Sequence, residues 1–241
     1  MKNKPFIICV SCILCFIIQL KAQNNFDSLY LDAIRTAMYP ATNTMDTNLV
    51  AITRKNQNLT WRTIDGDDYV LVSTWKWKNN FGDPGKCDTT KGQVWVTTVP
   101  ELKERMSRDT AADRDLRLKQ LLGLPPSLNY YLFIEFWVKP CDLFRPCPDK
   151  EISDSKCNTC FTSRDSLDKD HVRWVNDTRI SSYYGCGLYN QYPWTQLGYT
   201  YDWNPDNKSH IGLSEFIIDV NKIIYVNKVD STAAYLQKTK K

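Results

Sequence analysis

The alternation of apolar and polar residues predicts strands along most of the chain. Strands are expected at residues 49–52, 59–64, 69–78, 92–99, 130–138, 213–219 and 223–229. Residues 69–78 (YVLVSTWKWK) place a distinct set of side chains on each strand face, whereas 130–138 (YYLFIEFWV) is apolar on both faces, as in a central buried strand. The last two strands flank the short turn Val220-Asn221-Lys222 and are interpreted as a hairpin.

Two other stretches are predicted to be helical. The pattern of residues 26–38 (FDSLYLDAIRTAM) indicates a short helix. The main helical segment covers about 100–122, because Pro100 suits the first helical position and Gly123 supplies a C-terminal stop. A polar break at 109–113 would divide this segment into two helices. Strands on both sides of a helical segment predict an α+β fold with a mainly antiparallel sheet.

Aromatic residues are concentrated between positions 183 and 203. In the part 197–203 (LGYTYDW) they fall on alternate positions, which predicts a strand whose rings pack into the core. The preceding part, 183–194, has no clean period and abuts Cys186 and Pro193. Its rings, interleaved with polar residues, suit a polar organic ligand such as a sugar. The predicted ligand-binding residues are Tyr183, Tyr184, Tyr189, Tyr192 and Trp194.

The first 22 residues have the layout of a secretory signal peptide. A short basic start is followed by an apolar run from Pro5 to Leu20, and the small residue Ala22 marks a cleavage site. The apolar run is shorter than the roughly 20 residues that a membrane-spanning helix needs. We therefore predict a secreted or periplasmic protein, cleaved after Ala22, whose remaining residues 23–241 form one globular domain without a transmembrane segment.

Removing the signal peptide changes the charge of the chain. The whole sequence has a formal net charge of +4, and three of its lysines lie in the first 22 residues. The remaining chain therefore has a net charge of only about +1, which gives little support to nucleic-acid binding.

Six of the nine cysteines remain after cleavage, and an even number in an exported chain predicts disulfide bonds. They are Cys87, Cys141, Cys147, Cys157, Cys160 and Cys186. Most lie in a Cys-rich loop insertion at about 140–192, and a link from Cys87 to Cys186 would tie this insertion to the sheet. The CxxC pair Cys157–Cys160 also allows half of a structural zinc site or a redox-active pair as alternatives.

Two glutamates are the candidate catalytic residues. Glu135 lies inside the apolar strand 130–138, and Glu215 lies inside GLSEFII. A carboxyl group among apolar neighbours has a raised pKa, which suits a general acid, and two such groups on neighbouring strands would form an acid–base or nucleophile pair of the glycosidase type. The alternative is that each glutamate sits at a sheet edge or pairs with an arginine.

Other catalytic and metal-binding chemistries find little support in the sequence. It contains no HExxH, no GxSxG and no Gly-rich phosphate loop, and its two histidines, His171 and His210, are expected in exposed loops. The acidic stretch 149–154 lacks the turn glycine of a calcium loop, so we expect it to be solvated. No cofactor or metal is predicted.

Two functional hypotheses follow. The first is an exported, disulfide-stapled domain that binds a carbohydrate or cell-envelope ligand through its Cys/aromatic insertion. The alternative is an extracellular hydrolase or glycosyl-transferring enzyme that uses Glu215 and Glu135. The sequence leaves open whether the protein is an enzyme.

Overall fold

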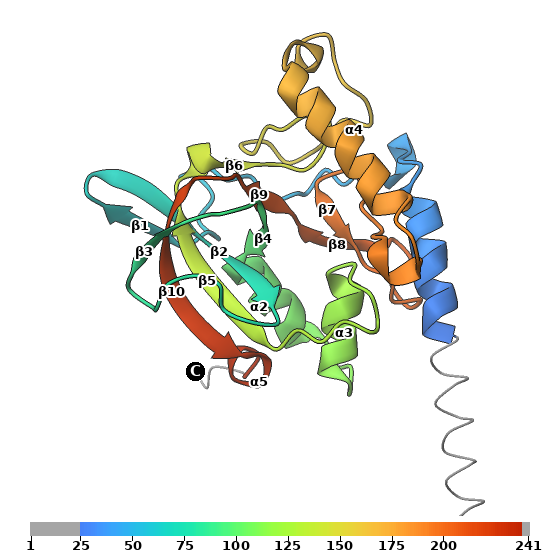
Figure 1. The fold of residues 1–241 in the computed structure, drawn as a ribbon, viewed down its shortest axis with the longest axis horizontal. Helices are drawn as coiled ribbons and strands as arrows, with labels where there is room; N and C mark the ends of the chain where they lie inside the picture. The colour runs from blue at the N-terminus through green and yellow to red at the C-terminus, as the bar shows by residue number, and fades with distance from the viewer. Residues whose placement is uncertain (1–24, 238–241) are drawn as a thin grey trace, which may run out of the picture.

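A computed structural model describes residues 25–237 (Figure 1), and the predicted signal peptide lies outside them. Residues 25–37 form the first helix, as predicted. The strands are β1 (Trp61–Ile64), β2 (Asp67–Lys76), β3 (Cys87–Thr89), β4 (Val94–Thr98), β5 (Leu132–Val138), β6 (Leu143–Phe144), β7 (Tyr199–Tyr201), β8 (Ile211–Ser214), β9 (Phe216–Ile218) and β10 (Ile223–Ser231). The remaining helices are α2 (Val99–Arg108), α3 (Arg114–Leu121), α4 (Lys169–Tyr183) and α5 (Thr232–Tyr235), with short 3-10 turns at Thr42–Thr44, Pro140–Asp142, Asp165–Leu167 and Leu188–Asn190. Within the described part of the chain, no helix is both long and apolar enough to cross a membrane.

Eight strands form one sheet in the order β3-β10-β5-β2-β4-β9-β6, with β1 paired to β2. Each of these pairings is antiparallel. A separate ribbon is made by β7 and β8. The mixture of helices with a mainly antiparallel sheet confirms the predicted α+β class.

The predicted C-terminal hairpin is wrong. β9 pairs with β4 and β6, whereas β10 pairs with β5 and β3, so three strands separate them in the sheet order. The turn between them bonds to Thr90 instead: the N–H of Asn221 donates to the Thr90 carbonyl at 2.8 Å, and the Thr90 hydroxyl donates to the Asp219 carbonyl at 2.7 Å. Because this short turn joins strands from distant places in the order, the sheet must curl, and β5 and β10 bend strongly in Figure 1.

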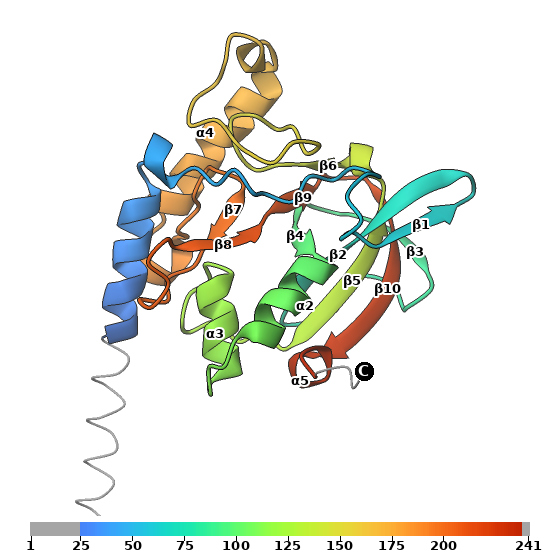
Figure 2. The ribbon, with the colours of Figure 1, turned by 180° about the vertical axis from the view of Figure 1, so that it is seen from behind.

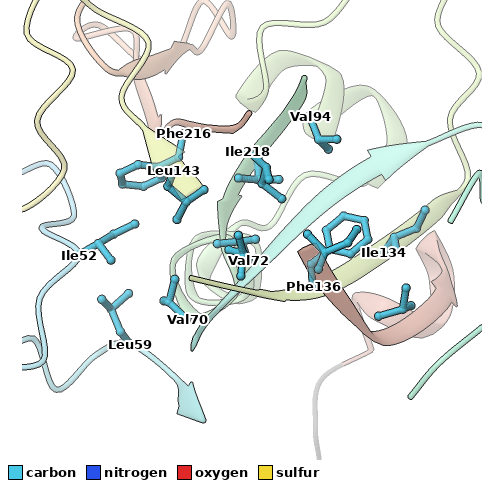
Figure 3. Close-up of a cluster of buried hydrophobic side chains, with 14 residues drawn as sticks. Ile52, Leu59, Val70, Val72, Val94, Ile134, Phe136, Leu143, Phe216 and Ile218 are labelled. Carbon is cyan, nitrogen blue, oxygen red and sulfur yellow. The ribbon is translucent and has the colours of Figure 1, made fainter. Parts of the chain in front are cut away.

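The inside of the curl is filled by aliphatic and phenyl side chains (Figure 3). Alternate residues of β2 and β5, such as Val72 and Phe136, are fully buried there, together with Phe216 of β9. Ile52 and Leu59 close one side of this cluster from the segment before β1. The predicted strand at 49–52 is absent, because this segment packs as an irregular stretch over the interior.

The outer face of the sheet is covered by α2, α3 and α5, and α2 lies in front of the sheet in Figure 2. Leu102 and Met106 of α2 pack with Trp75 and Phe133 of the sheet. The helical segment is divided as predicted, since the Asp113 side chain accepts a hydrogen bond from the N–H of Leu116 and begins α3.

The insertion at 140–192 is not only a loop, because it contains the 15-residue helix α4. The Asp168 side chain caps this helix by accepting from the N–H of His171. α4 packs beside the helix 25–37, with Val175 and Tyr183 in one buried cluster with Tyr30 (Figure 1). His171 is therefore buried, with Nε2 2.8 Å from the Cys147 carbonyl oxygen, and the expectation of an exposed loop histidine is wrong.

Arg145 organises the first part of the insertion. Its side chain is fully buried and pairs with Asp154 at 3.0 Å. It also donates to the carbonyls of Val50, Asp154 and Lys156. This loop is closed by the disulfide Cys147–Cys157. The acidic stretch 149–154 is therefore not wholly solvated, because Asp154 forms an ion pair with Arg145.

Only two of the six candidate cysteines are bonded. Cys87, Cys141, Cys160 and Cys186 carry free, exposed thiols. The suggested Cys87–Cys186 link is contradicted, because Cys87 lies on the edge strand β3 and Cys186 follows α4 on the other side of the molecule (Figure 1). A disulfide requires the two Cα atoms to lie within about 7 Å.

Alkylation distinguishes these two classes of cysteine. In the chain expressed from residue 23, we expect iodoacetamide without reductant to label the four exposed thiols, and Cys147 and Cys157 to react only after reduction. Peptide mass spectrometry measures this directly. Protection of any of the four exposed thiols before reduction would contradict the observed pairing.

Candidate functional site

A cavity of about 610 Å³ lies where β2 and β4 separate. The two strands pair only at Val72 with Thr98 and at Ser73 with Thr97. β2 nevertheless continues to Lys76, so the ladder ends before the strand does. The cavity is further lined by α4, by the loop after α3 and by β7. Its volume is in the range of small-molecule sites.

The edges of both strands form walls of the cavity. Consecutive residues 73–76 of β2 and 95–97 of β4 line the cavity. Side chains alternate between the two faces of a strand, so a run of consecutive lining residues means that the backbone edge of the strand borders the cavity. The Tyr131 N–H donates to the Lys76 carbonyl at 3.1 Å, so the Lys76 backbone faces β5. The backbone N–H and C=O groups of the other even-numbered residues of β2 face β5 in the same way. The backbone groups of Trp75 therefore face β4 beyond the end of the ladder.

Three indole rings form the wall opposite β2. Trp95, Trp174 and Trp194 lie with ring centroids 5.8–6.4 Å apart. The Trp174 ring is fixed by a 2.7 Å hydrogen bond from Nε1 to Gln93 Oε1. The Trp194 ring is fixed by a 3.1 Å hydrogen bond from Nε1 to the Pro146 carbonyl. Rings held in this way present rigid faces to a ligand.

Glu215 is the only acidic side chain that lines the cavity in the described part of the chain. It lies between β8 and β9, and its backbone N–H donates to the Gly198 carbonyl at 2.9 Å. Continuing the β4–β9 register by one residue places it opposite Thr97. Its carboxyl group makes no hydrogen bond or ion pair within residues 25–237. Burial raises the pKa of this carboxyl to about 8, so the neutral acid predominates at pH 7.

Lys76 is the only basic lining residue among those described. It ends β2, and its ammonium group has no hydrogen-bond or ion-pair partner within residues 25–237. Burial lowers the pKa of Lys76, because removal from water disfavours its charged form. Because side chains alternate along β2, the Lys76 side chain lies on the sheet face of Val72, opposite to the face of Ser73 and Glu215, and Lys76 borders the cavity through its backbone.

Glu135 shares the sheet face of Glu215 but does not line the cavity. It is paired with Ser73 on β2, and Ser73 is paired with Thr97 on β4, so Glu215 lies three strands away. This corresponds to a Cα separation of roughly 14 Å. The Glu135 carboxylate accepts from Lys103 Nζ at 2.8 Å and from Asn227 Nδ2 at 2.6 Å. These partners occupy both of its oxygens.

The five predicted aromatic residues fall into three groups. Tyr192 and Trp194 line the cavity, with Tyr192 40% exposed and thus at its rim. Tyr183 is buried and donates to the Trp194 carbonyl, while Tyr189 donates to Asp27. Tyr184 is 71% exposed and outside the lining. The first group remains a candidate binding surface, and Tyr183 and Tyr189 pack into the cluster between α4 and the helix 25–37.

Sequence reasoning missed most of the lining. Trp75, Trp95 and Lys76 lie in predicted strands, and nothing in their spacing marks them as cavity residues. Trp174 was missed together with α4, although Asp168 is a suitable N-cap and was a usable signal for that helix. Tyr201 was predicted to be buried, and it is, but it also borders the cavity.

Within residues 25–237, no three His, Cys, Asp or Glu side chains are grouped closely enough to hold a metal ion. No protein-family model, curated protein or solved structure matches the chain.

Proposed function

We propose that this protein is an exported binding protein that holds a small organic ligand in the cavity between β2 and β4. The observation that carries this proposal is the lining itself: fixed indole rings, strand edges beyond the end of a ladder and a carboxyl group without a partner surround about 610 Å³. The Glu215 side chain is half-buried, so its carboxyl group is accessible to a ligand that enters the cavity.

Carbohydrate and cell-envelope material are the ligand classes that the aromatic lining favours. Indole faces stack on flat or ring-shaped groups, and polar side chains nearby orient them. On the α4 side these polar groups come from Thr178, Ser181 and Ser182, and Asn190 adds an amide. Export, predicted from the first 22 residues, would place the cavity in contact with such material.

A second candidate function is acid-catalysed hydrolysis by Glu215. The observation that favours it is the pKa of about 8, which keeps a proton on the carboxyl at neutral pH, as a general acid requires. A two-carboxylate glycosidase mechanism also needs a partner at about 5–10 Å. Glu135, the sequence-based choice, is held by Lys103 and Asn227 outside the cavity. Binding is therefore the better supported function.

Two rim substitutions test whether the cavity binds the ligand. We expect Tyr192→Ala to weaken binding of a hit from a glycan array by about five- to twelvefold, because a stacked ring contributes roughly 1–1.5 kcal/mol. Ser181→Trp, at an exposed lining position, should block entry and abolish binding. Isothermal titration calorimetry measures both effects.

Tyr184→Ala is the matched control, since Tyr184 is an exposed tyrosine of the same segment that does not line the cavity. It should bind as the wild type does. Equal binding by all three variants would place the ligand elsewhere, and no glycan binding by the wild type would remove the carbohydrate class.

A further inference from the structure

Trp95 and Glu215 keep accessible surface in stretches of the sheet that are otherwise buried. Residues 94–99 are buried except for Trp95, and residues 212–218 are buried except for Glu215. Both side chains line the cavity. Ile217 is paired with Trp95, and continuing this register to Glu215 puts its side chain on the same sheet face as Trp95, as a diagonal neighbour. Such neighbours lie roughly 7–8 Å apart, so one small group can contact both the carboxyl group and the indole ring.

The rings of Trp174 and Trp194 extend the aromatic wall that begins at Trp95. The Trp194 ring stands nearly perpendicular to the other two, at interplanar angles of 87° and 80°. The side chain of Trp174, like that of Trp95, is half-buried and lines the cavity. Because the three rings are not parallel, their faces point in different directions, as in an aromatic cage. The face of an aromatic ring carries partial negative charge, so this wall attracts cations.

No basic side chain in the described lining balances this negative surface. Lys76 is the only basic residue of the lining, and its side chain lies on the opposite face of the sheet. The Glu215 carboxyl group has no hydrogen-bond or ion-pair partner within residues 25–237. A neutral ligand offers this carboxyl group only a hydrogen bond. A cation is attracted both by its ionised form and by the faces of the rings.

We propose that the ligand of this cavity carries an organic ammonium group, which binds between the carboxyl group of Glu215 and the indole faces of Trp95 and Trp174. This inference rests on the proposed binding function and names the chemistry of the ligand. Amino sugars of the cell envelope and choline-type headgroups both supply such a group. The uncharged part of either molecule then has the hydroxyl groups of Thr178 and Ser181 as hydrogen-bonding partners in the same cavity.

Binding of an ammonium group should release a proton from Glu215. Burial raises the pKa of this carboxyl to about 8, and a cation beside it lowers that pKa, so the acid ionises on binding at pH 7. The nearest other carboxyl group is Glu101 of α2, which has a pKa of about 7 and accepts from the N–H of Ser214. The remaining ionisable side chains of the lining are Lys76 and three tyrosines, Tyr130, Tyr192 and Tyr201. Choline has no proton to lose, so a proton released on its binding comes from the protein.

Two matched pairs of small molecules test the inference on the chain expressed from residue 23. Choline is compared with its neutral isostere, in which carbon replaces the nitrogen, and glucosamine is compared with N-acetylglucosamine. Isothermal titration calorimetry at pH 7 should show at least one charged molecule binding at least about tenfold more tightly than its neutral partner. A preference within the choline pair indicates a headgroup, and one within the sugar pair indicates an amino sugar. Equal binding within both pairs would overturn the inference.

Variants assign the charge recognition to the cavity. Glu215→Gln should reduce the affinity for the charged molecule to that for its neutral partner. It should also abolish the proton release, which is measured by titrating choline in buffers of different ionisation enthalpy. Trp174→Phe keeps a ring with a weaker attraction for cations and should weaken binding of the charged molecule by about threefold. Trp77→Phe, at an exposed tryptophan outside the lining, is the control. An unchanged charge preference in Glu215→Gln would contradict the proposed contact.

The outcomes also separate this inference from the proposed function. Binding of a neutral glycan that depends on Tyr192, without any preference for an ammonium group, would keep the cavity as a ligand site and refute the cationic ligand. Failure of glycans and of all four small molecules to bind would refute both proposals.

Discussion

Asp202→Ala is expected to lower the free energy of unfolding by about 3–5 kcal/mol, the largest stability loss that we predict for a polar substitution in this protein. The Asp202 side chain is fully buried and accepts two hydrogen bonds from Arg117, at 2.8 and 2.7 Å. It also accepts from Asn207 Nδ2 at 2.8 Å. Its removal leaves the guanidinium of Arg117, itself 6% exposed, with Asp109 as its remaining carboxylate.

Urea denaturation at pH 7 measures this loss. Glu104→Ala is the control, because Glu104 pairs with Arg108 on the exposed surface of α2 and should contribute at most about 0.5 kcal/mol. The double variant Arg117→Met/Asp202→Leu removes both charges and should recover part of the stability, because Asp109 keeps Arg114 as a partner at 3.9 Å. A loss below about 1 kcal/mol for Asp202→Ala would contradict a tightly coupled pair.

This ion pair also bears on the cavity. It joins α3 to the segment after β7, and the loop after α3 and Tyr201 both line the cavity. Gly123 in that loop has φ +65°, and a Cβ there would lie 3.2 Å from the Tyr201 carbonyl oxygen. A side chain at position 123 would therefore be strained by the positive φ and tightly packed against β7. The wall of the cavity therefore depends on a buried contact made outside it.

Local pattern was sufficient for most elements of the fold. Residues 69–78 and 130–138 are the neighbouring strands β2 and β5, and the polar break at 109–113 separates α2 from α3. Leu197, Tyr199, Tyr201 and Trp203 are buried as predicted, although Thr200 and Asp202 at the alternate positions are buried too. These successes share a cause, because period and turn chemistry are properties of consecutive residues.

The cavity could not be predicted in the same way. It exists because β2 and β4 stop pairing after Ser73 and Thr97, and the length of a ladder depends on tertiary packing rather than on the pattern of either strand. The hairpin error has the same origin, since Thr90 binds the turn residues from elsewhere in the chain. Glu215 was found because a carboxyl group inside an apolar run is itself a local anomaly.

The pH dependence of stability should change when Glu215 is replaced by glutamine. The folded-state pKa of about 8 lies above the 4.5 of an unperturbed glutamic acid, so the folded protein binds this proton more tightly than the unfolded chain. The stabilisation that comes from this tighter proton binding by Glu215 is complete below pH 4.5 and is lost as the pH rises to about 8. Glu215→Gln stays neutral throughout, so we expect it to be more stable than the wild type by about 2–4 kcal/mol at pH 9 and equal to it near pH 4.5.

Denaturant unfolding of both proteins across pH 4.5–9 measures the difference between their free energies of unfolding. Ionisable groups that both proteins contain, including Glu101 with its pKa of about 7, contribute equally to both and cancel in this difference. The other ionisable side chains that line the cavity are Lys76 and the tyrosines Tyr130, Tyr192 and Tyr201, and they are the same in both proteins. Glu104→Gln, on exposed α2, should follow the wild-type curve. Parallel curves for Glu215→Gln and the wild type would mean that the Glu215 carboxyl is already ionised or paired at neutral pH. In that case the Glu215 carboxyl is neither a proton donor nor an unpartnered acid at neutral pH. This result would contradict both its role as a general acid and its role in ligand binding.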